Sequence, residues 1–393
     1  MKSPIEITST IFHSVSEDDF CGYDPFDGLN SKLFKNLGLN NSRYLRLAWL
    51  QMHKRLTINI RPIVGIPKKR NPKGIALFIL GMIYEFNRTK DDSILSQAVD
   101  LGNWLLTQSC DREQWGHYCW GYHFDWQARA FYVPAGKPNI ITTCYVARAL
   151  HNLGVITHQQ NFINSALDSS RFISSHLFTE ADGHRFYAYI PDDKAFIHNA
   201  SLWGAAWCAF SGKELGDMQM IDQAMRVAHE SMKEQRKDGA WVYGSRDHHQ
   251  FIDGFHTGYN LEALCLLRDS LKTSEFDTFI QRGYSYYINN LITDNGTAKY
   301  YNDNTYPLDM HSFSQAIITL LKVGRNNSDF SICKKVVKQA IEQLYLPEKR
   351  KFIYQKTGLL TNRINYTRWT QAWAYYSLAL YNYYHSEGNH EED

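Results

Sequence analysis

The sequence predicts an all-α protein, an (α/α)6 toroid in which six helical hairpins close into a ring. Three observations lead to this fold class. Amphipathic helical segments alternate with segments that are apolar around their whole circumference. Loops with Asp-Gly or aromatic patterns recur between them, with short β-hairpins expected on one face. The residues that open the apolar segments are separated by a near-constant step.

The alternation predicts twelve helices in two rings. Amphipathic segments expose one face to water and are expected in the outer ring; they cover residues 41–57, 91–108, 159–177, 217–235, 273–290 and 328–344. The apolar segments, rich in Ala, Leu and Trp, are expected in the inner ring; they cover residues 73–86, 141–153, 199–210, 256–269, 311–323 and 367–384. Residues 1–40 are expected to be an N-terminal segment that closes the single toroid domain of residues 41–393.

The step is measured between the polar residues that open the inner segments. From His198 to His256, then to His311, then to Trp369, the steps are 58, 55 and 58 residues. One helical hairpin with its loop has this length. Loops such as residues 182–187, where Asp-Gly precedes alternating aromatics, predict a tight turn into a short strand. All inner helices then run in one direction, so their N-termini meet on one face, where we expect the functional site.

Composition narrows the functional class. The 42 basic and 40 acidic residues give a net charge of +2, and no basic run is longer than residues 68–70, so nucleic acid is not an expected partner. No window has the apolar length of a signal peptide or membrane span. The seven cysteines are scattered without a CxxC pair, which fits a cytoplasmic protein. The 14% share of aromatic residues suits a large helical core or stacking platforms for a carbohydrate.

Polar and aromatic residues collect where the loops meet the inner helices. The predicted catalytic residues are Asp253, His256, Asp125 and Tyr259. The predicted substrate-binding residues are Lys73, Trp120, Tyr122, His123, His198, His311, Arg368 and Trp369. Structural roles compete with these: Asp253 can be a helix N-cap, the histidines rim residues and the tryptophans core. HExxH, P-loop, dinucleotide and serine-nucleophile motifs are missing, so no metal or cofactor is predicted.

The types of these residues favour acid/base chemistry. Asp253 and His256 are three apart, so one helical turn places both on one side, where the carboxylate orients the imidazole as a general base. Arg368 and Lys73 are expected to hold an anionic group of a carbohydrate or sugar nucleotide. Histidine and tyrosine outnumber rim carboxylates, which favours epimerase- or lyase-like chemistry over hydrolysis by a carboxyl pair. The alternative is a non-catalytic glycan-binding or assembly subunit. A terpenoid cyclase is disfavoured because DxDD and DDxxD are absent.

Four motifs carry a resemblance to a known family. They are residues 22–31 (GYDPFDGLNS), 71–74 (NPKG), 122–127 (YHFDWQ) and 255–262 (FHTGYNLE). In these the chain resembles the VpsJ-like polysaccharide biosynthesis proteins, a bacterial family found with capsule and exopolysaccharide genes, from about residue 20 to 380. The resemblance implies a six-hairpin toroid and a polysaccharide context, with other polysaccharide-assembly proteins as partners. The layout is also similar to N-acylglucosamine 2-epimerases and unsaturated glucuronyl hydrolases.

Overall fold

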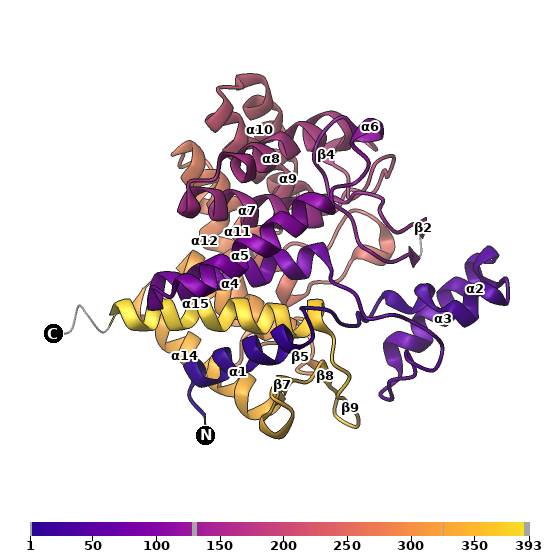
Figure 1. Ribbon diagram of the computed structural model, residues 1–393. Coiled ribbons are helices and arrows are strands. Elements are labelled where there is room, and N and C mark those ends of the chain that lie inside the picture. The colour runs from indigo at the N-terminus through magenta and orange to yellow at the C-terminus, as the bar shows by residue number, and fades with distance from the viewer. Residues whose placement is uncertain (1, 128–131, 325, 389–393) are drawn as a thin grey trace.

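The computed structural model describes residues 2–127, 132–324 and 326–388, and within them twelve helices form an inner and an outer ring (Figure 1). The inner ring consists of α4 (Pro72–Thr89), α7 (Ile140–Thr157), α9 (His198–Leu215), α11 (Gly254–Leu271), α13 (Met310–Thr319) and α15 (Trp373–Gly388). Each of these helices contacts the next, and α15 contacts α4, which closes the ring. π-Helical turns extend α13 at its end and α15 at its start; they are η5 (Leu320–Gly324) and η7 (Thr367–Ala372). The predicted (α/α)6 toroid is confirmed.

The outer ring confirms five of the six predicted outer segments. It consists of α1 (Pro4–Glu17), α5 (Asp92–Thr107), α8 (Gln160–Phe172) with η3 (Ile173–Leu177), α10 (Met218–Lys233), α12 (Asp277–Leu291) and α14 (Asn327–Leu344). The prediction of residues 41–57 as the first outer helix is wrong, because α1 takes that place against α15. The stripe of Ile7, Ile11 and Val15 on α1 is buried, as an outer helix requires.

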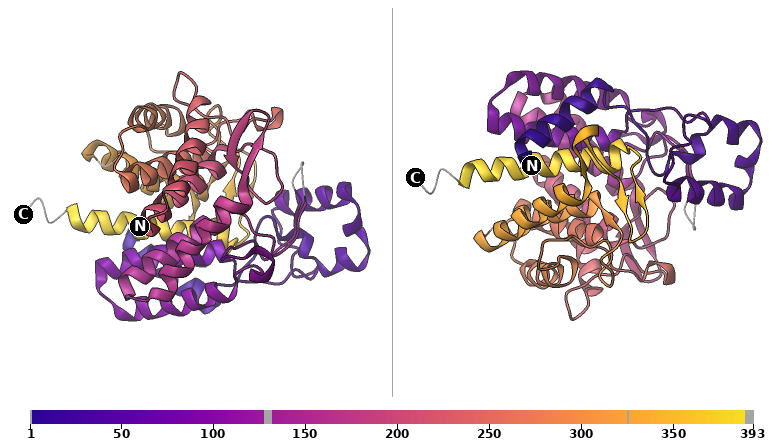
Figure 2. Two further views of the ribbon diagram at one scale, coloured as in Figure 1. Left: turned by 90° about the horizontal axis from the view of Figure 1, so that it is seen from above. Right: turned by 90° about the horizontal axis from the view of Figure 1, so that it is seen from below.

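The segment predicted as the first outer helix lies instead in residues 31–70, which we call the arm. The arm contains α2 (Lys32–Asn36), η2 (Leu39–Asn41) and α3 (Arg43–Arg55), and η1 (Asp27–Asn30) precedes it. It projects from the rings at one end (Figures 1 and 2). Before it, Tyr23 forms a β-bridge with Tyr366, and Asp24 forms an ion pair with Arg368. These contacts join the N-terminal segment to the last hairpin; the domain boundary at residue 40 stays a prediction.

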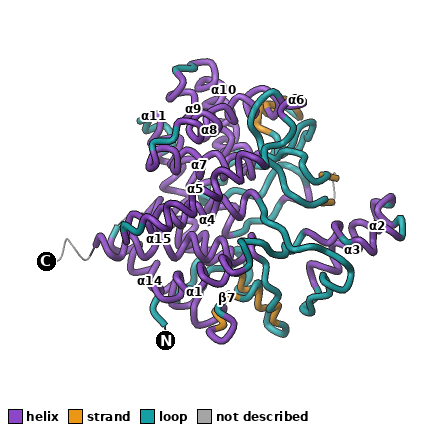
Figure 3. The backbone as a smooth tube through the Cα atoms, viewed as in Figure 1, coloured by secondary structure: helices purple, strands orange, loops and turns teal. Residues whose placement is uncertain are grey.

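Loops and short strands gather at the end of the rings where the inner helices begin (Figure 3). The antiparallel pairs are β1 (Trp126–Gln127) with β2 (Tyr132–Val133), β3 (Phe178–Ala181) with β4 (His184–Tyr187), β6 (Tyr345–Leu346) with β7 (Lys351–Phe352), and the sheet of β5 (Leu308–Asp309), β8 (Gln355–Lys356) and β9 (Thr361–Asn362). Asp182 and Gly183 join β3 to β4 with φ values of 52° and 81°, the backbone that an Asp-Gly hairpin turn requires. None of the described helices is long and apolar enough to cross a membrane.

The starts of four inner helices are set by N-cap side chains. Asn71, Asn139, Asp253 and Asp309 each accept a hydrogen bond from a backbone N–H in the first turn of their helix. Such caps satisfy N–H groups that have no partner within the helix. They therefore fix the residue at which each helix begins, and with it the direction in which each first-turn side chain points.

Candidate active site

A cavity of about 320 Å³ lies among the N-termini of the inner helices. The side chains that line it are mostly aromatic: Phe26, Lys54, Lys73, Tyr122, Phe124, Trp126, Ile141, Tyr189, Asn199, Tyr243, Phe251, Asp253, Phe255, His256, Tyr259, Tyr300, Tyr301, His311, Arg368 and Trp369. Cavities with apolar walls and a few polar groups are typical of small-molecule sites.

Six of these residues share one position, the second residue of an inner helix, with α15 counted from its first turn η7. They are Lys73, Ile141, Asn199, Phe255, His311 and Arg368. The six helices run in one direction, and successive residues of a helix are turned by about 100°. Equal positions counted from the helix start therefore face the same way, toward the axis of the ring. The cavity floor is thus set by the register of the six helix starts.

Asp253 and His256 form a hydrogen-bonded pair on the cavity wall. Nδ1 of His256 lies 2.6 Å from Oδ2 of Asp253, and the backbone N–H of His256 donates to Oδ1 at 2.8 Å. Asp253 is therefore both the N-cap of α11 and the partner of the imidazole. The carboxylate is almost fully buried, whereas the His256 side chain is 22% exposed. With Nδ1–H bound to the carboxylate, Nε2 has a free lone pair, which is the state that a general base needs.

Tyr259 and His311 form a second pair, in the buried part of the cavity. The Tyr259 hydroxyl lies 2.5 Å from Nε2 of His311. The His311 ring stacks between Phe255 and Trp373 at centroid distances of 4.6 and 4.4 Å. Burial, and then the nearby charges of Lys73 and other cations, hold the pKa of His311 well below its usual value; burial raises the pKa of Tyr259. The pair is therefore neutral, with one hydroxyl proton that it can share or donate.

Two lysines line the cavity and are candidates to bind an anionic group. The Lys73 ammonium lies 4.5 Å from the ring centre of Tyr145 and 5.2 Å from that of Trp373. Burial, and then the like charge of Arg368, lower its pKa. Lys54, from the arm, lies 5.0 Å from the ring of Phe26, and burial lowers its pKa as well. Among the described residues neither lysine forms an ion pair within 4 Å, so an anionic ligand in the cavity would favour the charged form that burial opposes.

Arg368 lines the cavity, but its guanidinium is already paired. Nε and a terminal nitrogen lie 2.5 and 2.8 Å from the two carboxylate oxygens of Asp24, and both side chains are buried. This bidentate geometry is the one predicted for a substrate anion, with a protein carboxylate in its place. Because the Asp24 carboxylate already binds the guanidinium of Arg368, Lys54 and Lys73 are better placed to bind a substrate anion.

Eight of the twelve predicted site residues line the cavity, and four do not. Trp120 is a core residue whose Nε1–H donates to the carbonyl of Leu105. His123 lines a small separate pocket together with Asp24 and Arg368, and its Nδ1 lies 3.2 Å from the Asn71 amide nitrogen. Asp125, predicted as catalytic, is held outside the cavity because its carboxylate accepts from the backbone N–H of Ala135 and pairs with Lys35.

His198, the fourth, is the first residue of α9 and points away from the cavity. Its Nδ1 lies 3.3 Å from the hydroxyl of Ser231 on the outer helix α10, and burial lowers its pKa to about 3. The next residue, Asn199, lines the cavity instead. Asn199 is not among the predicted site residues, because the repeats were aligned on their histidines.

The other missed lining residues are chiefly aromatic. Tyr243, Tyr300 and Tyr301 come from the recurring loops whose alternating aromatics predicted strands, so the pattern that marked the loops also marked cavity residues. Phe26 and Lys54 could not be found in this way, because they come from segments outside the repeat.

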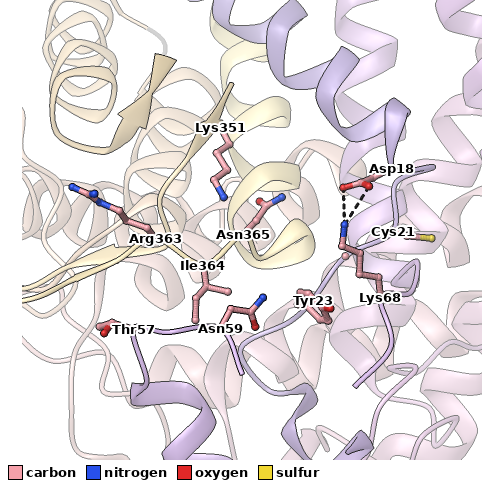
Figure 4. A pocket seen from close by; sticks show the side chains of 11 residues that line it. Asp18, Cys21, Tyr23, Thr57, Asn59, Lys68, Lys351, Arg363, Ile364 and Asn365 are labelled. Atoms are coloured by element: carbon pink, nitrogen blue, oxygen red, sulfur yellow. Dashed lines mark hydrogen bonds and ion pairs between the residues drawn. The ribbon is translucent and has the colours of Figure 1, made fainter. Parts of the chain in front are cut away.

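Among the described residues, neither a metal centre nor a second cleft offers chemistry comparable to that of the aromatic cavity. In the described part of the chain no three His, Cys, Asp or Glu side chains are grouped so that they could hold a metal. A second cleft, of about 430 Å³, lies between the N-terminal segment and the loop before η7; Figure 4 shows Lys68 paired with Asp18 on its wall and Lys351 opposite. The described lining of this cleft contains no histidine and one aromatic ring, Tyr23. We therefore place the candidate active site in the first cavity.

No protein-family model and no curated protein matches the sequence. Solved structures do share the fold. An unsaturated glucuronyl hydrolase specific for heparin has a TM-score of 0.65 at 12% identity, covering 98% of this chain and 96% of that one. A cellobiose 2-epimerase from Bacillus thermoamylovorans has a TM-score of 0.63 at 12% identity, covering 81% and 90%. A GH76 α-mannanase from Bacteroides thetaiotaomicron has a TM-score of 0.62 at 12% identity, covering 81% and 88%. All three are carbohydrate-processing enzymes; identities this low show the shared toroid alone.

Proposed function

We propose that this protein is a carbohydrate-active enzyme that moves a proton at a sugar carbon, in the manner of an epimerase or lyase. The observation that carries the proposal is the Asp253–His256 pair on the wall of an aromatic cavity. His256 is the general base, because its Nδ1–H is bound to the carboxylate and its Nε2 is free. Asp253 fixes the tautomer and stabilises the imidazolium that forms when the base takes a proton.

Tyr259 and His311 provide the complementary proton. When a proton leaves a carbon beside a carbonyl or carboxyl group, negative charge develops on the oxygen and must be stabilised. The Tyr259 hydroxyl lies 2.5 Å from Nε2 of His311, and in the tautomer in which Nε2–H donates to the tyrosine oxygen, the hydroxyl proton is available to that substrate oxygen. Lys73 lies beside this pair, with Nζ 5.3 Å from the ring centre of Tyr259, and negative charge that develops there would favour its protonated form.

Hydrolysis fits the lining less well than proton abstraction. A glycosidase usually needs two carboxyl groups across the scissile bond. Asp253 is the one carboxylate among the described lining residues, and its two oxygens are engaged with His256. The substrate class that we propose is an anionic glycan or sugar derivative, because the lining also holds Lys54 and Lys73.

We also propose a biological setting for this enzyme, the cytoplasmic part of capsule or exopolysaccharide metabolism. The motifs at residues 22–31 and 255–262 resemble proteins of capsule and exopolysaccharide biosynthesis, and we propose that context here. All seven cysteines lie in the described part of the chain and none forms a disulfide, which supports a reducing, cytoplasmic setting. The second candidate function, a glycan-binding or assembly subunit without catalysis, is favoured by the number of aromatic rings that line the cavity.

Proton exchange with solvent separates these functions. The protein is incubated in D₂O with neutral and uronic-acid-containing disaccharides, and products are followed by NMR. We expect deuterium at the carbon next to the carbonyl group, or a new C=C bond if elimination follows. Binding without deuterium uptake, epimer or unsaturated product supports the assembly subunit instead. Release of free monosaccharides without deuterium at carbon supports a hydrolase.

A further inference from the structure

The arm carries an extreme share of the positive charge of the protein. Residues 31–70 contain ten of the 42 lysines and arginines and none of the 40 acidic residues. The rest of the chain therefore has 32 basic and 40 acidic residues and a net charge of −8, whereas the arm has +10. A chain that is nearly neutral overall thus has one strongly basic projection.

The arm also exposes large apolar side chains. Seven of the exposed large hydrophobic residues belong to it: Leu33, Leu37, Tyr44, Leu45, Met52, Ile58 and Ile63. Tyr44, Ile58 and Ile63 are 80%, 72% and 84% exposed. In α3, Tyr44, Met52 and Arg55 are exposed at a spacing that places them on one face of the helix, whereas Leu50 and His53 face inward and are buried. Exposed apolar groups at this density mark an interaction surface.

Several basic groups of the arm are exposed beside these apolar side chains. Lys32, Arg55 and Lys69 are exposed and form no ion pair within 4 Å with the described residues. Other bases are used within the fold: Arg61 pairs with Asp27 and Lys35 with Asp125. The free positive charge and the apolar side chains therefore lie on the same projection, at the end of the rings that carries the cavity (Figures 1 and 2).

We propose that the arm binds the surface of an anionic lipid bilayer. Apolar side chains that enter the interface, together with lysines and arginines that face lipid phosphates, are the two components of peripheral membrane binding. Lys54 and Phe26 extend from this region to the cavity lining, so docking brings the cavity mouth to the membrane surface.

Two other occupants fit the arm less well. A second copy docking arm to arm would bring two charges of +10 together, which opposes association. A soluble anionic polysaccharide would use the charges but gives no role to exposed side chains such as Ile58 and Ile63. A bilayer with anionic headgroups uses both.

Vesicle flotation tests the proposal on the full chain without any substrate, so its outcome does not depend on the proposed proton transfer. We expect the protein to float with vesicles of phosphatidylcholine and phosphatidylglycerol, to bind phosphatidylcholine alone weakly, and to be released by salt. One variant combines Tyr44→Ser, Ile58→Ser and Ile63→Ser; another combines Lys32→Gln, Arg55→Gln and Lys69→Gln. Each should lower the partition coefficient at least about tenfold.

Matched controls make the same changes elsewhere. The apolar control combines Val155→Ser, Leu215→Ser and Met218→Ser, at the end of the rings where the inner helices finish. The charge control combines Lys90→Gln, Arg226→Gln and Lys272→Gln, which are exposed residues outside the arm. Thermal unfolding verifies that all variants fold. The proposal is overturned if the wild-type protein does not float, or if arm and control variants lose binding equally. It is also overturned if the wild type binds a soluble polyuronate and not vesicles, and only the charge variant loses that binding. A wild-type protein that is a dimer in solution, and that the apolar variant converts to a monomer, would overturn it as well.

Discussion

The first turns of α9 and α11 look alike in sequence and differ in structure. Each contains a histidine, and the two are 58 residues apart. His256 is the third residue of its helix, partly exposed to the cavity and bound to Asp253. His198 is the first residue of its helix, 1% exposed and hydrogen bonded to Ser231 of the outer ring. A shift of two residues turns a side chain by about 200° around the helix axis.

The residue before each helix adds a second difference. α11 has Asp253 as its N-cap, which both caps the helix and orients the imidazole. α9 has Ile197 in the same position, with no side chain to accept a hydrogen bond. A rim histidine therefore has a chemical role where its register points it into the cavity and a carboxylate caps its helix. The carboxylate can be read from the sequence, but the difference in register is hidden when the repeats are aligned on the histidines.

The largest change in stability is expected at Arg368, the second residue of η7, which lines the cavity at the same helix position as His311 and Asn199. Arg368→Met leaves the Asp24 carboxylate buried without its charged partner, with only the backbone N–H of Phe26, among the described residues, still donating to it, and we expect the free energy of unfolding to fall by about 3–5 kcal/mol. Urea denaturation measures this change. The double variant Asp24→Asn/Arg368→Met should recover part of the loss. If Arg368→Met unfolds like the wild type and weakens only the binding of anionic ligands, Arg368 is a substrate residue and the pairing with Asp24 is incidental.

The next effect separates the two roles of Asp253. Because asparagine caps helices about as well as aspartate, Asp253→Asn should change the free energy of unfolding by only a few tenths of a kcal/mol. The proton-transfer rate should fall by about 10² or more, since His256 loses the carboxylate that fixes its tautomer and stabilises its charged form. Denaturation and deuterium uptake are measured on the same preparation. An unchanged rate would mean that Asp253 is a cap only.

The effect that is smallest at neutral pH concerns His198, because it appears only when the pH is lowered. Burial lowers its pKa to about 3 in the folded protein, against about 6.5 in an unfolded chain. Between these values the unfolded state binds the proton and the folded state does not, so stability must fall as the pH drops from about 6.5 toward 3. His198→Asn should remove this pH dependence, so the free energy of unfolding of the variant should change less than that of the wild type between about pH 6.5 and 3. A steeper curve in the variant would contradict the buried, neutral assignment.

The sequence predicted the ring architecture well because it rests on periodicity. Amphipathic and apolar segments recur, and five outer and six inner helices were found from them. The first outer helix was missed because the arm interrupts the repeat, and α3 within it has an apolar stripe of its own. The hydrophobic pattern of the sequence alone does not show which of the two amphipathic segments, α1 or α3, joins the outer ring.

The candidate site was predicted only in part, since it depends on register as well as residue type. The Asp253–His256 pair was found from its spacing of three residues. Arg368 was correctly placed in the cavity, but its pairing with Asp24 joins residues 344 positions apart and has no local signal. Asn199 has one: counting from the helix start, rather than from the histidine, places it level with His311.

Two matched variants decide whether His256 is the base and its counterpart His198 is structural. His256→Asn and His198→Asn make the same chemical change at the two helix starts, and deuterium uptake into a sugar that the wild type turns over is measured by NMR. We predict a loss of about 10²–10⁴ in rate for His256→Asn with the fold retained, and a rate within about twofold of wild type for His198→Asn. Equal uptake by wild type and a folded His256→Asn protein would contradict the account.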